Sequence, residues 1–303
     1  MRILIIGYGS IGKRHYEVLK NFKNVVTIDI VTQQILKNKT TYFNLNNIDN
    51  INIYDYFIIA SATNKHFEHL SYLELNVKNK LIFCEKPIFD TYKNLIIKNN
   101  KVYIGYVLRF HPLFQKLSKL VETEKIINVN VNCGQYLPTW RADTNYKDSY
   151  SAKKEEGGGV LLDLSHEIDY VQYLCGNINE LHSYQVKISD LEINSDDFVN
   201  IIGKTNKNIF INVSIDYISK ITHRRLFLNT LNYSYELDFI QNILIQKDKN
   251  GTELIFKNTD LERNMLFKSM HESILSNRTK YICTYTEAID VMKTVSIVQE
   301  QNK

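Results

Sequence analysis

The chain opens with MRILIIGYGSIG at residues 1–12, and this stretch decides the fold. A short apolar run, Arg2 to Ile6, leads directly into a glycine turn and then into KRHYEVLKNF, which reads as a helix. Strand, glycine turn and helix in this order indicate a dinucleotide-binding unit, in which backbone N–H groups at the helix N-terminus meet the charge of a pyrophosphate. The turn residues expected to bind the cofactor are Gly7, Tyr8, Gly9, Ser10, Ile11 and Gly12.

An acidic residue follows in the second apolar run, Val25 to Val31. Asp29, taken as the end of that strand, would accept hydrogen bonds from the adenosine ribose hydroxyls and would repel a 2′-phosphate. NAD is therefore the expected cofactor, in preference to NADP. Two alternatives stay open because the apolar run continues past Asp29: this residue can be a solvated turn residue, and Thr32 can take its role.

Three further apolar runs predict strands of the same sheet: Tyr56 to Ala60, Leu81 to Cys84 and Val102 to Val107. Continuous apolar runs are typical of parallel strands that are covered on both faces, and crossover helices are expected between them. The predicted N-terminal domain, residues 1–120, is therefore a Rossmann dinucleotide-binding domain of the α/β class.

From about Lys125 the pattern changes to strand candidates joined by short polar turns, which favours an open, largely antiparallel sheet. Between the first two candidates, GGGVLLDLSHEIDYVQYLCG reads as one amphipathic helix that ends at Gly176, and Thr286 to Gln299 reads as another. Residues 121–303 are thus predicted to form an α+β domain for substrate binding and oligomerisation. Its first strand candidates are Ile127–Cys133, Phe198–Ile202 and Ile209–Ile215.

The composition excludes several classes of function. A net charge of +4 without a long basic run gives no reason to expect nucleic-acid binding, and no run of about 20 apolar residues predicts a membrane span. The N-terminus lacks the pattern of a signal peptide, so a cytoplasmic location is expected. The four cysteines are scattered, and the run Ser195-Asp196-Asp197 reads as a turn, so no metal site is expected.

Three further segments carry a resemblance to a known family: Ser61-Ala62-Thr63-Asn64 with His66 soon after, Glu85-Lys86-Pro87, and GYVLRFHP at residues 105–112. Together with the glycine turn they resemble the Gfo/Idh/MocA oxidoreductases over essentially the whole chain. The resemblance implies a homo-oligomer, dimer or tetramer, formed through the exposed face of the C-terminal sheet. It also implies that Ser61, Thr63, Asn64 and His66 lie along the cofactor, and that Glu85 and Lys86 lie near the nicotinamide.

Lys86 is the expected catalytic residue. A lysine ammonium at the carboxyl end of a strand can donate a hydrogen bond to the substrate oxygen that changes between alcohol and ketone, and it can stabilise developing negative charge there. Pro87 would stiffen the turn that presents this lysine. The competing interpretation is a solvated surface lysine.

The segment from Gly157 to Gly176 resembles the second active-site element of the family, normally an Asp and a His four positions apart on a helix. Here Asp163 and His166 are three apart, and they still share a face if the helix is regular. His166 is the leading proton acceptor, because an imidazole titrates near neutral pH, and Asp163 would orient it or bind a substrate hydroxyl. His166 can instead be structural, paired with Asp169 or Glu167, and the proton acceptor can be this histidine or the lysine.

The segment QYLPTWR at residues 135–141 is expected to line the mouth of the substrate pocket. Aromatic faces stack on sugar rings, and an arginine can clamp a phosphate or a carboxylate, which makes Arg141 the leading specificity residue. Two alternatives stay open: Trp140 can pack between domains, and Arg109 can form a salt bridge at the domain junction. The residues expected to bind substrate are Arg109, Tyr136, Trp140, Arg141 and Tyr150.

This loop and the glycine triplet resemble a branch of the family found with bacterial surface-polysaccharide biosynthesis. The resemblance implies an NAD(P)-dependent oxidoreductase that moves a hydride between nicotinamide and a CH–OH carbon of a sugar derivative. A nucleotide-linked or acidic amino sugar is the expected small-molecule substrate. The alternatives are other redox chemistry on the same fold, such as imine reduction or NAD-assisted glycoside cleavage, and a non-catalytic NAD-binding sensor.

Overall fold

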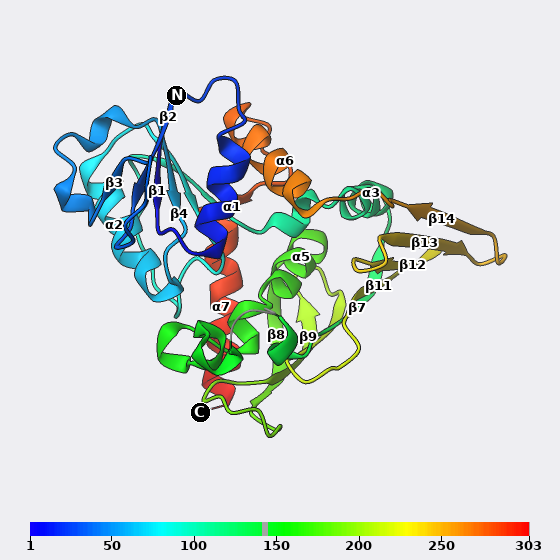
Figure 1. The fold of residues 1–303 in the computed structure, drawn as a ribbon. Helices are drawn as coiled ribbons and strands as arrows, with labels where there is room; N and C mark the ends of the chain where they lie inside the picture. The colour runs from blue at the N-terminus through cyan, green and yellow to red at the C-terminus, as the bar shows by residue number, and fades with distance from the viewer. Residues whose placement is uncertain (141–144, 303) are drawn as a thin grey trace. The chain divides into compact units, whose positions relative to one another are not determined.

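The computed structural model describes residues 1–140 and 145–302, and the chain forms two compact units (Figure 1). The first unit combines Met1–Val107 with Glu262–Ile289. The second combines Leu108–Leu261 with Asp290–Lys303. The division therefore differs from the expected boundary near residue 120, because a late segment of the chain returns to the first unit.

Two late elements make up that returning segment. The helix α6 (Arg263–Leu275) packs against α1 (Ser10–Leu19), and the two helices lie side by side in Figure 1. The short strand β15 (Cys283–Thr284) pairs antiparallel with β6 (Lys101–Ile104) at the edge of the sheet. Most apolar residues of α6 are buried within the first unit: Leu266, Phe267, Met270 and Ile274.

In the described residues, the first unit holds a sheet in the order β15-β6-β5-β4-β1-β2-β3. Apart from β15, neighbouring strands pair in parallel. The chain moves outward from β1 in one direction and then from β4 in the other, so the switch point that binds ligands in such sheets lies between β1 and β4. The remaining strands of this sheet are β1 (Arg2–Ile6), β2 (Thr27–Val31), β3 (Thr41–Tyr42), β4 (Tyr56–Ile59) and β5 (Leu81–Cys84).

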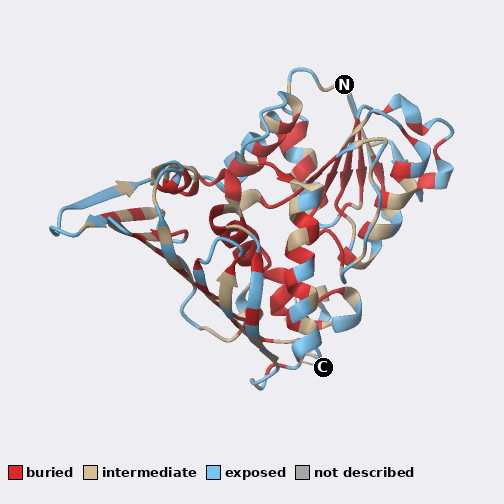
Figure 2. Cartoon of the chain, turned by 180° about the vertical axis from the view of Figure 1, so that it is seen from behind, coloured by how far each residue is buried: buried red, intermediate tan, exposed pale blue. Residues whose placement is uncertain are grey.

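The predicted strands at Arg2–Ile6 and Leu81–Cys84 are confirmed residue for residue. Their side chains are apolar on both faces, and Figure 2 shows the central strands of this sheet buried almost throughout. The prediction of a crossover helix between β5 and β6 is wrong. An irregular segment stands there instead, and the Glu74 carboxylate at the end of α2 (His66–Asn76) accepts the backbone N–H groups of Lys98 and Asn99 at 2.7 and 2.6 Å.

The second unit holds a sheet in the order β14-β13-β12-β11-β7-β10-β9-β8. Strands β7 and β10 pair in parallel, and the other neighbours pair antiparallel, which confirms the largely antiparallel prediction. The strands are β7 (Ile126–Gly134), β8 (Ile178–Val186), β9 (Phe198–Thr205), β10 (Phe210–Asp216), β11 (His223–Thr230), β12 (Tyr233–Asp238), β13 (Ile243–Asp248) and β14 (Glu253–Lys257).

Helices cover one face of this second sheet. The helices α4 (Val160–Asp163) and α5 (His166–Cys175) contact its central strands, and α3 (Pro112–Val121) contacts β12 and β13. Along β7, Val129 and Val131 point to this covered side and are buried, whereas the asparagines that alternate with them lie on the other face. The predicted last helix is confirmed as α7 (Tyr285–Gln301). No helix in the described part of the chain is long and apolar enough to cross a membrane.

Candidate cofactor and substrate sites

The glycine turn after β1 leaves open space in front of a helix N-terminus. Gly7 has a φ of +97°, and a Cβ there would lie 2.6 Å from backbone atoms of Ala60 and Ser61. A Cβ on Gly12 would overlap the carbonyl oxygen of Gly7, so both positions must be glycine for the turn to close. Gly9, by contrast, has no neighbour within 4 Å of a Cβ, and no side chain caps the helix that follows it. The turn therefore fits a pyrophosphate bound by backbone N–H groups.

The expected placement of Asp29 at the end of its strand is wrong. β2 continues to Val31, and the Asp29 carboxylate accepts a hydrogen bond of 2.5 Å from the hydroxyl of Tyr54. Burial and this hydrogen bond raise the pKa of Tyr54. The first residue beyond the strand is Thr32, whose side-chain oxygen accepts the backbone N–H of Gln34 at 3.1 Å. Thr32, the alternative to Asp29 that the sequence left open, thus stands at the carboxyl end of β2.

The loop after β4 is held by two histidines. One ring nitrogen of His69 lies 2.9 Å from the Ser61 hydroxyl oxygen. The ring nitrogens of His66 lie 3.0 Å from the carbonyl oxygen of Pro87 and 3.1 Å from that of Ser61. His66 is 1% exposed, and burial lowers its pKa. This histidine therefore ties the loop after β4 to the loop after β5, and Thr63 and Asn64 lie in the short helical turn between Ser61 and His66.

Glu85 and Lys86 directly follow β5, at the same edge of the sheet as the glycine turn. Glu85 is 7% exposed, with one carboxylate oxygen 2.9 Å from Nε2 of His15 and the other accepting the backbone N–H of Lys86 at 3.2 Å. A Cβ on Gly105 would lie 3.0 Å from the first of these oxygens, so the glycine leaves room for the carboxylate. Lys86 is partly exposed, and the Lys86–Pro87 peptide bond is cis.

In the second unit, the expected single helix is interrupted. α4 ends at Asp163, Leu164 adopts φ −102° and ψ 28°, and α5 begins at His166. Asp163 and His166 therefore do not share the face of one regular helix, although Gly176 ends α5 as predicted. Both side chains are buried, at 5% and 8% exposure. They stand on either side of the corner between the two helices.

Asp196 from a distant turn fixes the start of α4. Its carboxylate accepts the backbone N–H of Leu161 at 2.9 Å, and a Cβ on Gly159, which has a φ of +115°, would overlap it. Burial raises the pKa of Asp196. The adjacent Asp197 accepts the backbone N–H groups of Ile188 and Ser189 at 2.8 and 3.0 Å. In the described residues, no group of three or more His, Cys, Asp or Glu could hold a metal ion.

The loop after β7, which was expected to line the substrate pocket, reaches Asp163 through Tyr217, a residue that sequence reasoning missed. The Tyr217 hydroxyl donates a 2.5 Å hydrogen bond to the Asp163 carboxylate, and the indole of Trp140 packs edge-on against the Tyr217 ring, with centroids 5.1 Å apart. Burial and Asp163 raise the pKa of Tyr217 well above its usual value. Because β7 and β10 are parallel, the residues after them meet, and the backbone N–H of Leu137 donates to the carbonyl of Tyr217.

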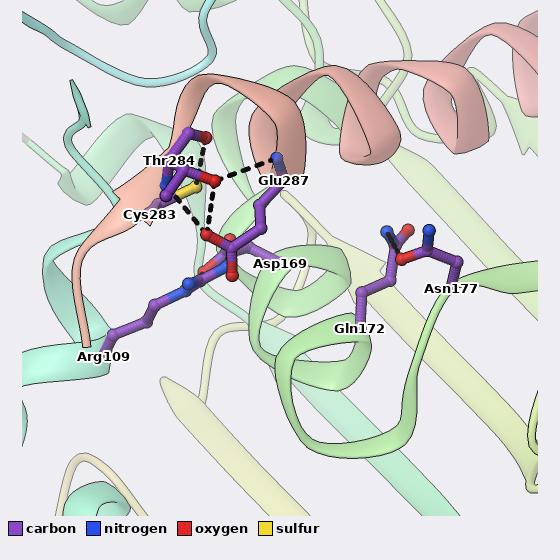
Figure 3. Close-up of polar contacts among 7 residues, drawn as sticks. All are labelled: Arg109, Asp169, Gln172, Asn177, Cys283, Thr284 and Glu287. Carbon is purple, nitrogen blue, oxygen red and sulfur yellow. Dashed lines mark hydrogen bonds and ion pairs between the residues drawn. The ribbon is translucent and has the colours of Figure 1, made fainter. Parts of the chain in front are cut away.

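The other expected substrate residues divide into three groups. Tyr136 lies 4.5 Å from the Lys220 ammonium, measured to the ring centroid, and Tyr150 begins a short helical turn before the glycine triplet. Arg141 lies outside the described residues. Arg109 is 2% exposed and forms a bidentate pair with Asp169, at 2.9 and 2.7 Å (Figure 3). This pair lies inside the second unit and favours a structural role for Arg109.

Both carboxylates named as alternative partners of His166 also bind arginines. Asp169 accepts Arg109, and Glu167 lies 2.8 Å from Nε of Arg224 while being fully buried. A structural His166 paired with one of these carboxylates stays the alternative to His166 as proton acceptor. The corner between α4 and α5 brings together three groups. They are the imidazole of His166, the Asp163 carboxylate that accepts the Tyr217 hydroxyl, and Trp140, which packs against the Tyr217 ring.

Comparisons with known proteins agree with this architecture. Residues 1–96 match the family model described as the oxidoreductase family, NAD-binding Rossmann fold, and residues 114–229 match the model of the GFO/IDH/MocA C-terminal domain. A 2,7-anhydro-N-acetylneuraminate hydratase of Escherichia coli K12 is 26% identical over 58% of this chain and 50% of its own length. The aligned part thus spans half the length of this relative.

Solved structures match over nearly the whole chain. Levoglucosan dehydrogenase in complex with NADH superposes with a TM-score of 0.81 and 15% identity, over 99% of this chain and 96% of that one. A UDP-N-acetylglucosamine 3-dehydrogenase from Acidithiobacillus ferrooxidans gives a TM-score of 0.75 and 14% identity, over 100% and 97%. At these identities the likeness establishes the fold.

Proposed function

The chain belongs to the Gfo/Idh/MocA oxidoreductase family and has its NAD-binding Rossmann domain, and from this premise we propose that it is an NAD-dependent dehydrogenase or reductase acting on CH–OH groups. The observation that carries the proposal is the edge of the first sheet. There the open glycine turn, Ser61 and the Glu85-Lys86 pair all follow neighbouring parallel strands. A cofactor laid along this edge would extend from the turn toward Lys86.

The bound cofactor would supply the hydride acceptor, and the side chains of this protein would handle the proton. Lys86 donates a hydrogen bond to the substrate oxygen and stabilises charge on it as the carbon is oxidised. In the second unit, His166 is the proposed proton acceptor. Asp163, held by the Tyr217 hydroxyl, is the proposed contact for a neighbouring substrate hydroxyl.

We propose a sugar derivative as the substrate, either nucleotide-linked or an acidic amino sugar. Trp140 is half-buried, and its edge-on packing against Tyr217 leaves indole surface for a sugar ring. The names of the aligned proteins support the same class, since one acts on an anhydro derivative of an acidic amino sugar and another on a nucleotide-linked amino sugar. Arg141 remains the proposed partner of an anionic group.

NAD is the proposed cofactor in preference to NADP. The Asp29 carboxylate would repel a 2′-phosphate, and residues 29–36, which read DIVTQQIL, contain no arginine or lysine before Lys37 and Lys39. Thr32 and Asp29 share the proposed role toward the adenosine ribose. Equal turnover with both cofactors would contradict this preference.

The second sheet offers a surface for a homo-oligomer. On its outward face, Ile202, Asn212, Asn130 and Phe227 form one row across four neighbouring strands, and Phe210 lies on the same face at 64% exposure. Apolar side chains spaced among asparagines on an open face are suited to burial against a second copy, so we propose a dimer or tetramer. Light scattering of the wild type and of Phe227→Asp would test this.

A redox-neutral reaction is the second candidate. The Escherichia coli relative is named a hydratase, and water addition or removal assisted by NAD leaves no net NADH. The same side chains would serve, because an oxidation that is later reversed needs the same proton transfers. Product formation without accumulation of NADH would favour this candidate, and NAD binding without any product would favour the sensor.

The decisive test is turnover on a panel of nucleotide-linked and acidic amino sugars, followed by NADH absorbance and by product analysis. We expect NADH from the wild type with one member of the panel and loss of turnover in Lys86→Ala. Lys101→Ala, an exposed lysine at the opposite end of neighbouring β6, should retain turnover. Unchanged turnover in Lys86→Ala would overturn the assignment of that lysine.

A further inference from the structure

A continuous chain of buried polar side chains runs through the first unit and ends at Glu85. The Tyr56 hydroxyl lies 2.9 Å from Nδ1 of His271, Nε2 of His271 lies 2.8 Å from Nδ1 of His15, and Nε2 of His15 lies 2.9 Å from Glu85. Tyr56, His271 and His15 are each 0% exposed. The side chains come from β4, α6, α1 and the end of β5, so four separate elements build one line of hydrogen bonds that we call the Tyr56 relay.

The protons of the Tyr56 relay can be placed by counting donors and acceptors. A neutral imidazole donates through one nitrogen and accepts through the other. If Glu85 is ionised it can only accept, so His15 must carry its proton on Nε2. His271 must then carry its proton on Nε2 as well, and its Nδ1 accepts the hydroxyl proton of Tyr56. Every hydrogen bond in the line is satisfied in this arrangement, with one negative charge at Glu85.

The competing arrangements each leave a proton without an acceptor. If Glu85 is protonated, or if His15 is an imidazolium, both histidines donate toward Tyr56. The Tyr56 hydroxyl would then have to donate elsewhere, and the described residues offer it no acceptor other than His271. An imidazolium at His271 would also be costly, since burial lowers the pKa of this histidine well below its usual value.

We propose that Tyr56, His271 and His15 are positioning residues that hold Glu85 as a carboxylate, with every proton of the relay directed toward it. The other oxygen of Glu85 accepts the backbone N–H of Lys86, so the relay fixes the peptide that presents the lysine. This catalytic consequence rests on the proposed dehydrogenase function, whereas the proton arrangement itself does not.

The direct test is imidazole ¹⁵N NMR of the full chain, which distinguishes the two neutral tautomers from the imidazolium. Signals are assigned by comparison with His271→Phe and His15→Gln. We expect both histidines of the wild type to be neutral with the proton on Nε2. A proton on Nδ1 of His15 in the wild type, or an imidazolium there, would overturn the proposal.

The variant Glu85→Gln provides a second test of the proton arrangement. With its oxygen toward the Lys86 N–H, the amide would donate to Nε2 of His15 and reverse both tautomers, which leaves the Tyr56 hydroxyl proton without an acceptor. With its oxygen toward His15, its NH₂ group faces the Lys86 N–H. Either orientation leaves one buried donor unsatisfied, so we expect the urea midpoint of unfolding to fall below that of the wild type. An unchanged midpoint in Glu85→Gln would contradict the relay. Because the substitution is nearly isosteric, the fold can be checked on the same sample from the amide spectrum.

Turnover separates this inference from the proposed function. In Tyr56→Phe, which removes one hydroxyl, we expect kcat to fall roughly tenfold, as for one hydrogen bond that supports a charged group, with KM for NAD unchanged. Tyr72→Phe, on the half-buried Tyr72 of α2, is the matched control and should behave as the wild type. Expected tautomers without any wild-type turnover would refute the dehydrogenase and leave the relay standing. Full turnover with reversed tautomers would refute the relay alone.

Discussion

The hydroxyl of Tyr217 donates a 2.5 Å hydrogen bond to the carboxylate of Asp163, and both side chains are buried. Tyr217 follows β10, and Asp163 is the last residue of α4, so the bond joins the sheet of the second unit to the corner that carries His166. Through its ring, Tyr217 also supports Trp140 in the substrate loop. One residue thus links the proposed substrate surface to the proposed catalytic carboxylate.

Tyr217→Phe should separate these two roles. The ring stays, so the Trp140 contact is kept, but Asp163 loses a buried donor. We expect the free energy of unfolding to drop by about 1–3 kcal/mol and kcat/KM for the sugar to fall about tenfold. Urea unfolding and steady-state turnover measure the two effects. Tyr184→Phe, on a side chain that is 71% exposed, is the control, and wild-type turnover in Tyr217→Phe would argue against a role for Asp163.

The sequence pattern predicted the strands of the first unit because each strand is marked by a run of neighbouring apolar residues. Apart from the exposed Arg2 at its start, β1 is apolar on both faces, as is β5, and Gly7 and Glu85 follow them, so the limits of both strands could be predicted to the residue. The glycine turn and the Glu85-Lys86 pair follow such strands, and their placement at one sheet edge followed from parallel pairing alone.

The errors concern features set by distant residues. The break between α4 and α5 could not be predicted, because Asp196, which binds the start of α4, lies 35 positions from its partner Leu161. Tyr217 was missed because its partner lies 54 positions away. Asp29 was misplaced for a different reason. Its distance from the glycine turn fits the usual pattern, but β2 extends to Val31 and Tyr54 takes up the carboxylate.

Substitutions of Arg109 test whether this residue, which was expected to bind substrate, instead has a structural role through Asp169. Both side chains are 2% exposed and form a bidentate pair. Replacing Arg109 with Met would leave the Asp169 carboxylate buried without its main partner, so we expect the free energy of unfolding to drop by roughly 3–5 kcal/mol in urea. Arg109→Lys should recover only part of this loss, since an ammonium cannot donate the same planar pair of bonds. Normal stability with a raised KM for the sugar would instead restore Arg109 as a substrate residue.

Gly9 and Gly12 form a matched pair in the glycine turn. A methyl group on Gly9 meets no protein atom within 4 Å, so Gly9→Ala should fold normally while the methyl occupies the space proposed for the pyrophosphate. We expect the Kd for NAD to rise roughly tenfold or more by calorimetry. Gly12→Ala places its Cβ against the Gly7 carbonyl and should lower the free energy of unfolding by about 1–3 kcal/mol. NAD binding that is unaffected in Gly9→Ala would exclude this turn as the cofactor site.

His69 makes stability depend on pH below neutrality. Burial lowers the pKa of His69 from 6.5 to about 4, and its ring lies 2.9 Å from the Ser61 hydroxyl. Below the unfolded pKa the unfolded chain binds a proton that the folded protein does not. The stability that His69 contributes is therefore complete above about pH 6.5 and is lost as the pH falls toward 4.

For His69 this loss amounts to roughly 3 kcal/mol at most. The measurement is the free energy of unfolding in urea at several pH values across that window, for the wild type and for His69→Gln. The glutamine keeps an oxygen for the Ser61 hydroxyl but does not titrate, so the pH dependence of this variant should be shallower than that of the wild type. Carboxylates other than the neighbouring Glu68, whose pKa His69 helps to lower, contribute equally in both proteins and cancel in the comparison. Parallel curves for the two proteins would show that the His69 pKa is not depressed by folding.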